Sequence, residues 1–177
     1  MNLLSFAFVD PSLFFSTMTL KYGRHFADND QAQSALKRIV LRGPADRDFS
    51  ADGEQADYPL LAEWPSARLL LEDIAKQITG HIGVQNPQIG QVIVQSLAAD
   101  SHIPWLTDNS PYAQHHVRFK LLVSPCTGGC WYSGAEALAP IMGNLTYMNH
   151  RVLHSAVNLG SVPQISLIVD ARSPTIQ

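Results

Sequence analysis

The chain has 177 residues, of which 46% are hydrophobic and 15% charged, and its formal net charge is −3. This length and composition predict one globular domain that buries a substantial core. The mild negative charge gives no reason to expect nucleic acid or an anionic membrane as a partner, and no apolar run reaches the roughly 18 residues of a membrane span.

The first part of the chain is expected to be mainly helical. The apolar segment at its start, residues 1–9, has no basic residues and is followed directly by Asp10-Pro11. This pattern favours a first strand over a signal peptide. A helix is expected from Asp10 to Gly23 and a short one from Ala32 to Ile39, followed by a strand over Ile39–Arg42. Residues 43–60 are polar, with frequent Gly, Pro and Asp, and predict a long loop of the kind that often covers a site.

The clearest helix signal runs from Ser66 to Thr79. Proline precedes it, and Gly80 is expected to end it. Leu70, Ile74 and Ile78 recur every four residues and so lie on one face. This apolar face predicts a helix that packs on a sheet.

From residue 88 onwards the pattern is that of short strands. They are expected at Gln91–Leu97, His116–Val123, Asn144–Met148, His154–Asn158 and Ile165–Val169. Short strands preceded by helices indicate helices packed on a β-sandwich or barrel. We therefore expect a single domain over 1–177, with helical support and a lid loop in 1–87 and a β-core in 88–172.

Two cations alternate with apolar residues in the strand expected at His116–Val123. Arg118 and Lys120 share one face, and Phe119 and Leu121 lie on the other. The polar face either is exposed to solvent or points into the mouth of the barrel, where two cations need an anionic ligand.

A second polar series begins at His154. Alternation places His154, Ala156 and Asn158 on one face of the strand. The histidine is either a partly buried side chain satisfied by a hydrogen bond or a member of a lined cavity.

The two cysteines, Cys126 and Cys130, flank a glycine turn. They could close a small loop or contribute half of a metal site, but two free thiols are the favoured interpretation, since there is no second pair of cysteines. The cysteine usage suits a reducing cytoplasm, where we expect the protein to reside.

Several segments occur in an order that resembles a known family. They are Ile103-Pro-Trp-Leu-Thr-Asp108, Arg118-Phe-Lys120-Leu, Gly143-Asn-Leu-Thr-Tyr-Met-Asn, His154-Ser-Ala-Val-Asn and Gln164-Ile-Ser-Leu-Ile-Val-Asp170. The order is similar to that of the aspartyl/asparaginyl β-hydroxylase branch of the Fe(II)/2-oxoglutarate oxygenases, including the bacterial cis-proline hydroxylase type. The resemblance covers most of the chain and is most specific from residue 102 to 172. It implies an α+β fold that is mainly β: a double-stranded β-helix, or cupin-like jelly roll, with N-terminal helices packed on one face.

The resemblance also implies a site. In this family two imidazoles and one carboxylate hold Fe(II) and leave positions open for 2-oxoglutarate and oxygen. Asp108 falls on the carboxylate and His154 on the distal histidine. Arg118 falls on the arginine of the family's Arg-x-His strand.

Three positions depart from the family pattern. Leu106 stands where the first metal histidine is expected, and a leucine cannot ligate a metal. Lys120 replaces the histidine of the Arg-x-His strand. Gln164 stands where a late arginine would bind 2-oxoglutarate, and a glutamine cannot replace a guanidinium against a carboxylate. The facial triad is therefore degenerate.

Three functions remain open. In the first, the protein is a 2-oxoglutarate-dependent dioxygenase in which Asp108 and His154 hold Fe(II), with water or another histidine as the third ligand. Lys120, Arg118 or Gln164 would then bind 2-oxoglutarate, and the substrate would be a free amino acid or a small derivative. The further histidine candidates are His102, His115 and His116.

In the second, the protein is a metal-independent enzyme. Asp108, Lys120 and His154 would act as acid/base groups on a small anionic substrate, with Arg118 as its clamp. A lysine beside an arginine could have a lowered pKa and serve as a base or a Schiff-base nucleophile. In the third, the barrel only binds a ligand or a protein partner.

Four more residues are expected near the substrate pocket. Trp105 and Tyr147 would line its wall, and His116 shares a strand face with Arg118. Asn158 either makes a hydrogen bond within the barrel or orients the substrate. For Asp108, capping of the turn that follows is the competing structural role.

Overall fold

Two antiparallel β-sheets and a helix of 18 residues make up most of the fold in this computed structural model. It describes residues 1, 3–9, 35–48, 53–62, 64–82 and 86–172. Within these residues, no helix combines the length and apolarity needed to cross a membrane.

The larger sheet has seven strands in the described part of the chain, and each neighbouring pair is antiparallel. In spatial order they are β1 (Leu3–Phe8), β9 (Asn144–Met148), β6 (Val117–Leu122), β11 (Gln164–Arg172), β4 (Gln88–Leu97), β2 (Leu36–Pro44) and β3 (Gln55–Asp57). Strands β6 and β11 therefore lie side by side near its centre.

The smaller sheet is also antiparallel. Its strands, in spatial order, are β5 (Ser101–Leu106), β10 (His154–Asn158), β7 (Gly129–Ser133) and β8 (Glu136–Leu138). From β4 to β11 the chain passes repeatedly from one sheet to the other. Residues far apart in sequence thus face each other across the interior.

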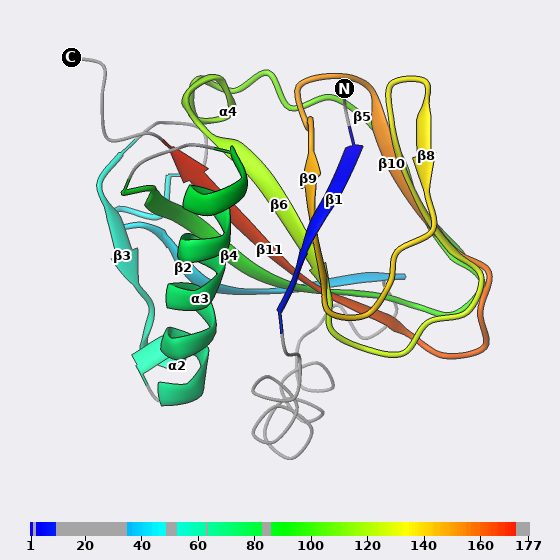
Figure 1. Cartoon of the computed structure of the whole chain (residues 1–177), viewed down its shortest axis with the longest axis horizontal. Helices are drawn as coiled ribbons and strands as arrows, with labels where there is room; N and C mark the ends of the chain where they lie inside the picture. The colour runs from blue at the N-terminus through cyan, green and yellow to red at the C-terminus, as the bar shows by residue number, and fades with distance from the viewer. Residues whose placement is uncertain (2, 10–34, 49–52, 63, 83–85, 173–177) are drawn as a thin grey trace.

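The helix α3 (Pro65–Ile82) covers the outer face of the larger sheet, on the side away from β5, β10 and β8 (Figure 1). Leu70, Ile74 and Ile78 are at most 1% exposed, which confirms the predicted apolar stripe. They belong to one core cluster with Phe119 and Val169 of the sheet. The helix continues through Gly80 to Ile82, because an isolated helical glycine costs only about 1 kcal/mol, which packing of the stripe outweighs.

Two short helices complete the described elements. The first, α2 (Pro59–Ala62), leads into α3, and the second, α4 (Pro111–His115), connects β5 to β6. Ser110 caps α4, since its hydroxyl accepts a hydrogen bond from the Ala113 amide at 3.2 Å.

The N-terminal part is less helical than expected. Residues 36–39, expected to end a short helix, belong to β2, and the loop expected over 43–60 contains β3. The strand expected at Ile39–Arg42 is confirmed within β2. The helix expected over Asp10–Gly23 lies outside the described residues.

The strand predictions after residue 88 hold well. Asn144–Met148 and His154–Asn158 are strands with the expected bounds, and the other three differ by a few residues at their ends. The predicted alternation in β6 is also confirmed. Phe119 and Leu121 join the core under α3, whereas Lys120, on the opposite face, is only 3% exposed and points between the sheets rather than into solvent.

The two cysteines do not pair. Cys126 lies beside the Asn158 and Gln164 side chains, with its Sγ 3.5 Å from a polar atom of each. Cys130 follows the alternation of β7 to the face opposite the buried Trp131. Both thiols are free, as favoured from the sequence.

The contact between α3 and the larger sheet yields a first prediction. Ile74→Ala removes a fully buried side chain from a position where alanine suits the helix, so it should lower the free energy of unfolding by about 2–5 kcal/mol. Urea denaturation followed by circular dichroism measures the change. Leu69→Ala, at a neighbouring position that is 58% exposed, is the control and should cost less than about 0.5 kcal/mol. Equal losses in both variants would contradict the packing of this helix.

Candidate functional site

A cavity of about 470 Å³ lies between the two sheets. The larger sheet contributes a polar wall, and the smaller sheet and the segment after β5 contribute the opposite one. The polar and charged side chains that line it are Arg38, Gln91, Gln95, Thr107, Asp108, Ser110, Tyr112, Arg118, Lys120, His154 and Ser155. The cavity therefore gathers Asp108, Arg118, Lys120 and His154, which the sequence singled out from three separate segments.

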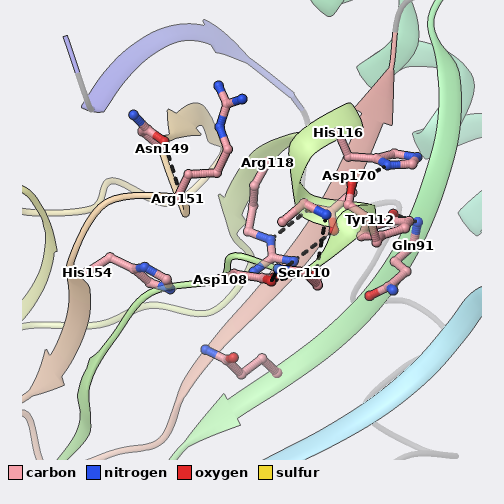
Figure 2. A network of polar contacts seen from close by, with 12 residues as sticks. Gln91, Asp108, Ser110, Tyr112, His116, Arg118, Asn149, Arg151, His154 and Asp170 are labelled. Carbon is pink, nitrogen blue, oxygen red and sulfur yellow. Dashed lines mark hydrogen bonds and ion pairs between the residues drawn. The ribbon is translucent and has the colours of Figure 1, made fainter. Parts of the chain in front are cut away.

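Arg118 is fixed by a buried carboxylate. Its Nε and one terminal nitrogen each donate to Asp170 at 2.8 Å, and Asp170 is fully buried (Figure 2). The two residues are direct partners in the β6–β11 register. Burial opposes the charge of Arg118, but the bidentate contact with Asp170 outweighs it and raises the pKa of the guanidinium above its ordinary value. Arg118 is therefore a permanent cation.

Asp108 has a structural role and a free oxygen. Its Oδ1 accepts hydrogen bonds from the Ser110 amide at 3.2 Å and the Ser110 hydroxyl at 2.7 Å, so Asp108 does cap the turn, the role that competed with a functional one (Figure 2). Its Oδ2 lies 3.9 Å from Arg118. Burial raises the pKa of the carboxyl, but the Ser110 hydrogen bonds and Arg118 lower it further than burial raises it. Asp108 is thus ionised at neutral pH.

His154 is the first residue of strand β10, and one of its two ring nitrogens forms a hydrogen bond. Its Nδ1 lies 3.0 Å from the Val152 carbonyl oxygen, which can only accept, so Nδ1 carries the proton. Burial lowers the pKa of this imidazole, and Arg118 and Lys120 lower it further, whereas the bond to Val152 opposes the change. His154 is therefore neutral, with an unprotonated Nε2.

Lys120 is a buried cation of the cavity wall. It is 3% exposed, and its ammonium lies 4.5 Å from the centre of the buried Trp131 ring. Burial, then Arg118, then Arg38 lower its pKa to about 7. Within the described part of the chain, no carboxylate forms an ion pair with it.

Sequence reasoning missed Arg38, which extends from β2 to the cavity. Its Nε donates to the Gln95 side chain at 3.3 Å, and the residue is exposed, so this cation lies at the accessible side of the cavity. The residue was missed because the segment was expected to be helical. Read as a strand, the alternation of Arg38 and Val40 would have placed both on the inner face.

His150 was also missed, although it lies next to the site. It is 1% exposed, its backbone carbonyl accepts from the Asp108 amide at 3.0 Å, and its Nε2 is buried without a hydrogen bond to the described residues. Burial first, and Arg118 second, lower its pKa to about 4 against the opposing effect of Asp170. A histidine in a turn has no periodicity that predicts the direction of its side chain, so the sequence carried no signal for it.

Gln164 lies outside the cavity lining. It is 1% exposed, and its side-chain oxygen accepts from the Trp131 indole at 3.1 Å. The Gln164 side chain instead holds Trp131, the ring over which the Lys120 ammonium lies. The expectation that Gln164 helps to bind a cofactor thus has no geometric support.

The four residues expected around the substrate pocket do not line this cavity either. Trp105 is 52% exposed beside Tyr132, and Tyr147 packs against the core under α3. His116 stacks on Tyr112 and lines a separate cavity. Asn158 is fully buried and donates to the carbonyls of Leu97, Ala98 and Val162, so it is a tether between strand ends.

The donor set does not fit a resident Fe(II). Asp108 and His154 are present, but the β5–β10 register sets Leu106 directly opposite His154, where a third ligand would be needed. Among the described residues, no three His, Cys, Asp or Glu side chains gather closely enough to hold a metal ion. The guanidinium of Arg118, 3.9 Å from Asp108, also opposes a dication. His102 and His115, the other candidate ligands, are exposed and lie outside the cavity.

No protein-family model matches the chain, and no curated protein matches it. Solved structures of similar fold do exist. An oxidoreductase of the 2OG-Fe(II) oxygenase family from Burkholderia pseudomallei has a TM-score of 0.60 at 11% identity, over 78% of this chain and 66% of that one. The viral collagen prolyl hydroxylase of Paramecium bursaria Chlorella virus-1 has a TM-score of 0.60 at 9% identity, over 99% and 97%. A prolyl-4-hydroxylase from Pseudomonas putida has a TM-score of 0.58 at 10% identity, over 98% and 94%.

These structures define the class of fold. The chain has the fold of the 2OG-Fe(II) oxygenases, with two antiparallel sheets around a central cavity. At such low identities the likeness concerns the fold alone, and the chemistry must come from the site.

The position of Leu106 yields a second prediction. Leu106→His would place an imidazole opposite His154 and two residues before Asp108, so Mn(II) affinity should rise by about tenfold or more, as detected by electron paramagnetic resonance. Trp105→His is the matched control, because that side chain points to the outer face of the same strand. Tight stoichiometric Mn(II) binding by the unmodified protein, lost in Asp108→Ala, would contradict our view of the donor set.

His150 yields a third prediction. Its pKa is about 4 in the folded protein, against an ordinary value of about 6.5, so the unfolded chain binds more protons between these values. The free energy of unfolding should therefore fall as the pH is lowered from 6.5 to 4, by up to about 3 kcal/mol from this residue. Urea titrations at several pH values measure it. The fall should be much smaller in His150→Gln and unchanged in His102→Gln; identical curves for all three proteins would refute the assignment.

Proposed function

We propose that the cavity binds a small carboxylate anion and does so without iron. The observation that carries this proposal is the excess of positive charge around it. Among the described residues, Arg38, Arg118 and Lys120 line the cavity, against one lining carboxylate, Asp108. The second acid, Asp170, is fully buried and already engaged by Arg118. A buried ammonium without a counter-ion either binds an anion or loses its proton, so an anionic ligand would stabilise the charged form of Lys120.

The likeness in fold supports a dicarboxylate as the ligand class. The viral prolyl hydroxylase of similar fold was solved as a complex with 2OG. A cavity of about 470 Å³ has room for an anion of that size, and the cations on its wall supply the charge. Since the late arginine of the family is replaced by the occupied Gln164, Lys120 and Arg38 would take the carboxylates in this chain.

We also propose that the chain is a diverged relative of the aspartyl/asparaginyl β-hydroxylase branch, built as a double-stranded β-helix. The matches at Asp108, Arg118 and His154 support the relationship, and the passage of the chain between the two sheets supports the architecture. As an enzyme it would act on a free amino acid or a small derivative. The ionised Asp108 and the unprotonated Nε2 of His154 would accept protons from the ligand.

Iron-dependent oxygenation is the competing function. The Nδ1 bond of His154 to a backbone carbonyl favours it, because metal-binding histidines are usually oriented in this way. The described residues offer no third ligand and the guanidinium of Arg118 lies close to Asp108, which both oppose this function. Dependence on a metal therefore separates the two functions.

Succinate, a dicarboxylate without a keto group, provides the fourth prediction. In the presence of EDTA it should bind the protein, as measured by isothermal titration calorimetry. Because the protonated Lys120 attracts the anion and its pKa is about 7, the affinity should fall as the pH rises from 6 to 8. Lys120→Met should weaken binding by about tenfold and remove most of this pH dependence.

The control is Lys76→Met, which replaces an exposed lysine of α3 and should bind succinate as the unmodified protein does. Binding that appears only when Fe(II) or Mn(II) is added would favour the oxygenase instead. Absence of binding under both conditions would reject the proposed ligand class.

A further inference from the structure

We propose that Lys120 acts as a nucleophile that forms a Schiff base with the ketone of a 2-oxo acid. The inference rests on the proposed function, since the carboxylate of the acid must first bind in the cavity. It adds a covalent chemistry that the fold itself does not require.

The first argument is the position of the amine. Lys120 extends from the centre of the larger sheet into the cavity, with 3% of the residue exposed. Its ammonium lies over the face of Trp131, which Gln164 holds in place through the indole N–H. No carboxylate of the described residues pairs with it, so the nitrogen is available to a ligand. A lysine that served only as a structural cation would be expected to have a counter-ion.

The second argument is the protonation state. Only a neutral amine attacks a carbonyl, and a lysine with an unperturbed pKa of about 10.4 is neutral in fewer than about one molecule in a thousand at pH 7. Burial and the two neighbouring guanidinium groups lower the pKa of Lys120 to about 7. A substantial fraction of the protein molecules therefore holds a neutral amine here at neutral pH.

The third argument is the arrangement of charge around the amine. A 2-oxo acid carries its ketone next to a carboxylate. Arg38 and Arg118 are close enough to depress the charge of Lys120, and both line the same cavity. A carboxylate that contacts one of these guanidinium groups would hold the adjacent carbonyl carbon in the same cavity as the amine.

The step balances without an oxidant or a metal. The lone pair of Lys120 Nζ forms a C–N bond with the carbonyl carbon as the C=O π bond breaks, and one of the two N–H protons passes to the carbonyl oxygen, giving a carbinolamine. The remaining N–H proton passes to His154 Nε2, which is unprotonated and lines the facing wall, and from there to the hydroxyl, which departs as water. The products are one imine and one water molecule.

Reductive trapping tests the inference. The full-length protein is incubated at pH 7 with EDTA, sodium cyanoborohydride and either 2-oxoglutarate or pyruvate. An imine at Lys120 should be reduced to a stable amine, and the protein mass should rise by that of the acid less one oxygen atom. Peptide mapping should place the label on Lys120, with at least about tenfold less on Lys76, whose amine is exposed and lacks the cavity.

Two variants and one ligand complete the design. Lys120→Arg keeps a cation but should lose the label, while Lys76→Arg should keep it. Succinate binding is measured on the same samples and cannot give an imine. Succinate binding without any label on Lys120 would overturn this inference and leave the proposed function standing.

Equal labelling of Lys120 and Lys76 would also overturn the inference, since it would show ordinary surface reactivity. Failure of both succinate binding and labelling would reject the proposed function together with it. Labelling of Lys120 by a 2-oxo acid in the unmodified protein, lost in Lys120→Arg, is the result that supports it.

Discussion

The buried ion pair between Arg118 and Asp170 is the interaction on which the cavity depends. It joins the two central strands of the larger sheet through two hydrogen bonds of 2.8 Å. A carboxylate that is fully buried is tolerated only when it is paired, and removing one partner of such a pair costs about 3–5 kcal/mol. The pair also places a permanent positive charge beside the cavity. That charge contributes to the lowered pKa of Lys120, His150 and His154, and it helps to keep Asp108 ionised. One pair of residues therefore both holds the strands together and sets the protonation of the site.

Periodicity predicted the parts of the fold in which burial follows a repeat. The four-residue spacing of Leu70, Ile74 and Ile78 identified the face of α3 that packs on the sheet, and the alternation around Lys120 identified the inner face of β6. Both predictions succeeded because a helix or a strand in contact with a core must repeat its apolar residues with its own period.

The misses have physical causes of their own. Arg38 was assigned to a helix because its segment is too short to distinguish a period of two from one of 3.6. The burial of His150 depends on contacts made across a turn, which no local pattern encodes. The hydrogen bond between Gln164 and Trp131 joins residues 33 positions apart, and only the folded chain brings them together.

The comparison with the oxygenases shows how little of a fold's chemistry resides in its framework. The two sheets have the arrangement of the oxygenase fold, yet the β5–β10 register places a leucine opposite His154. An apolar side chain at that position, together with the cationic wall, is the basis of our proposal that the cavity binds an anion rather than a metal cation. A fold does not by itself determine function, because the chemistry of a site depends on the individual side chains that line it.

Because Lys120 lies over the ring of Trp131, the fluorescence of this tryptophan should depend on what happens in the cavity. An indole responds to charge and to contact at its face, and this fully buried ring lies against Lys120 of the cavity wall. The other two tryptophans lie elsewhere, since Trp64 belongs to the core under α3 and Trp105 is exposed. With those two replaced by phenylalanine, the fluorescence of Trp131 would register the arrival of a ligand and the loss of the lysine proton without any added label.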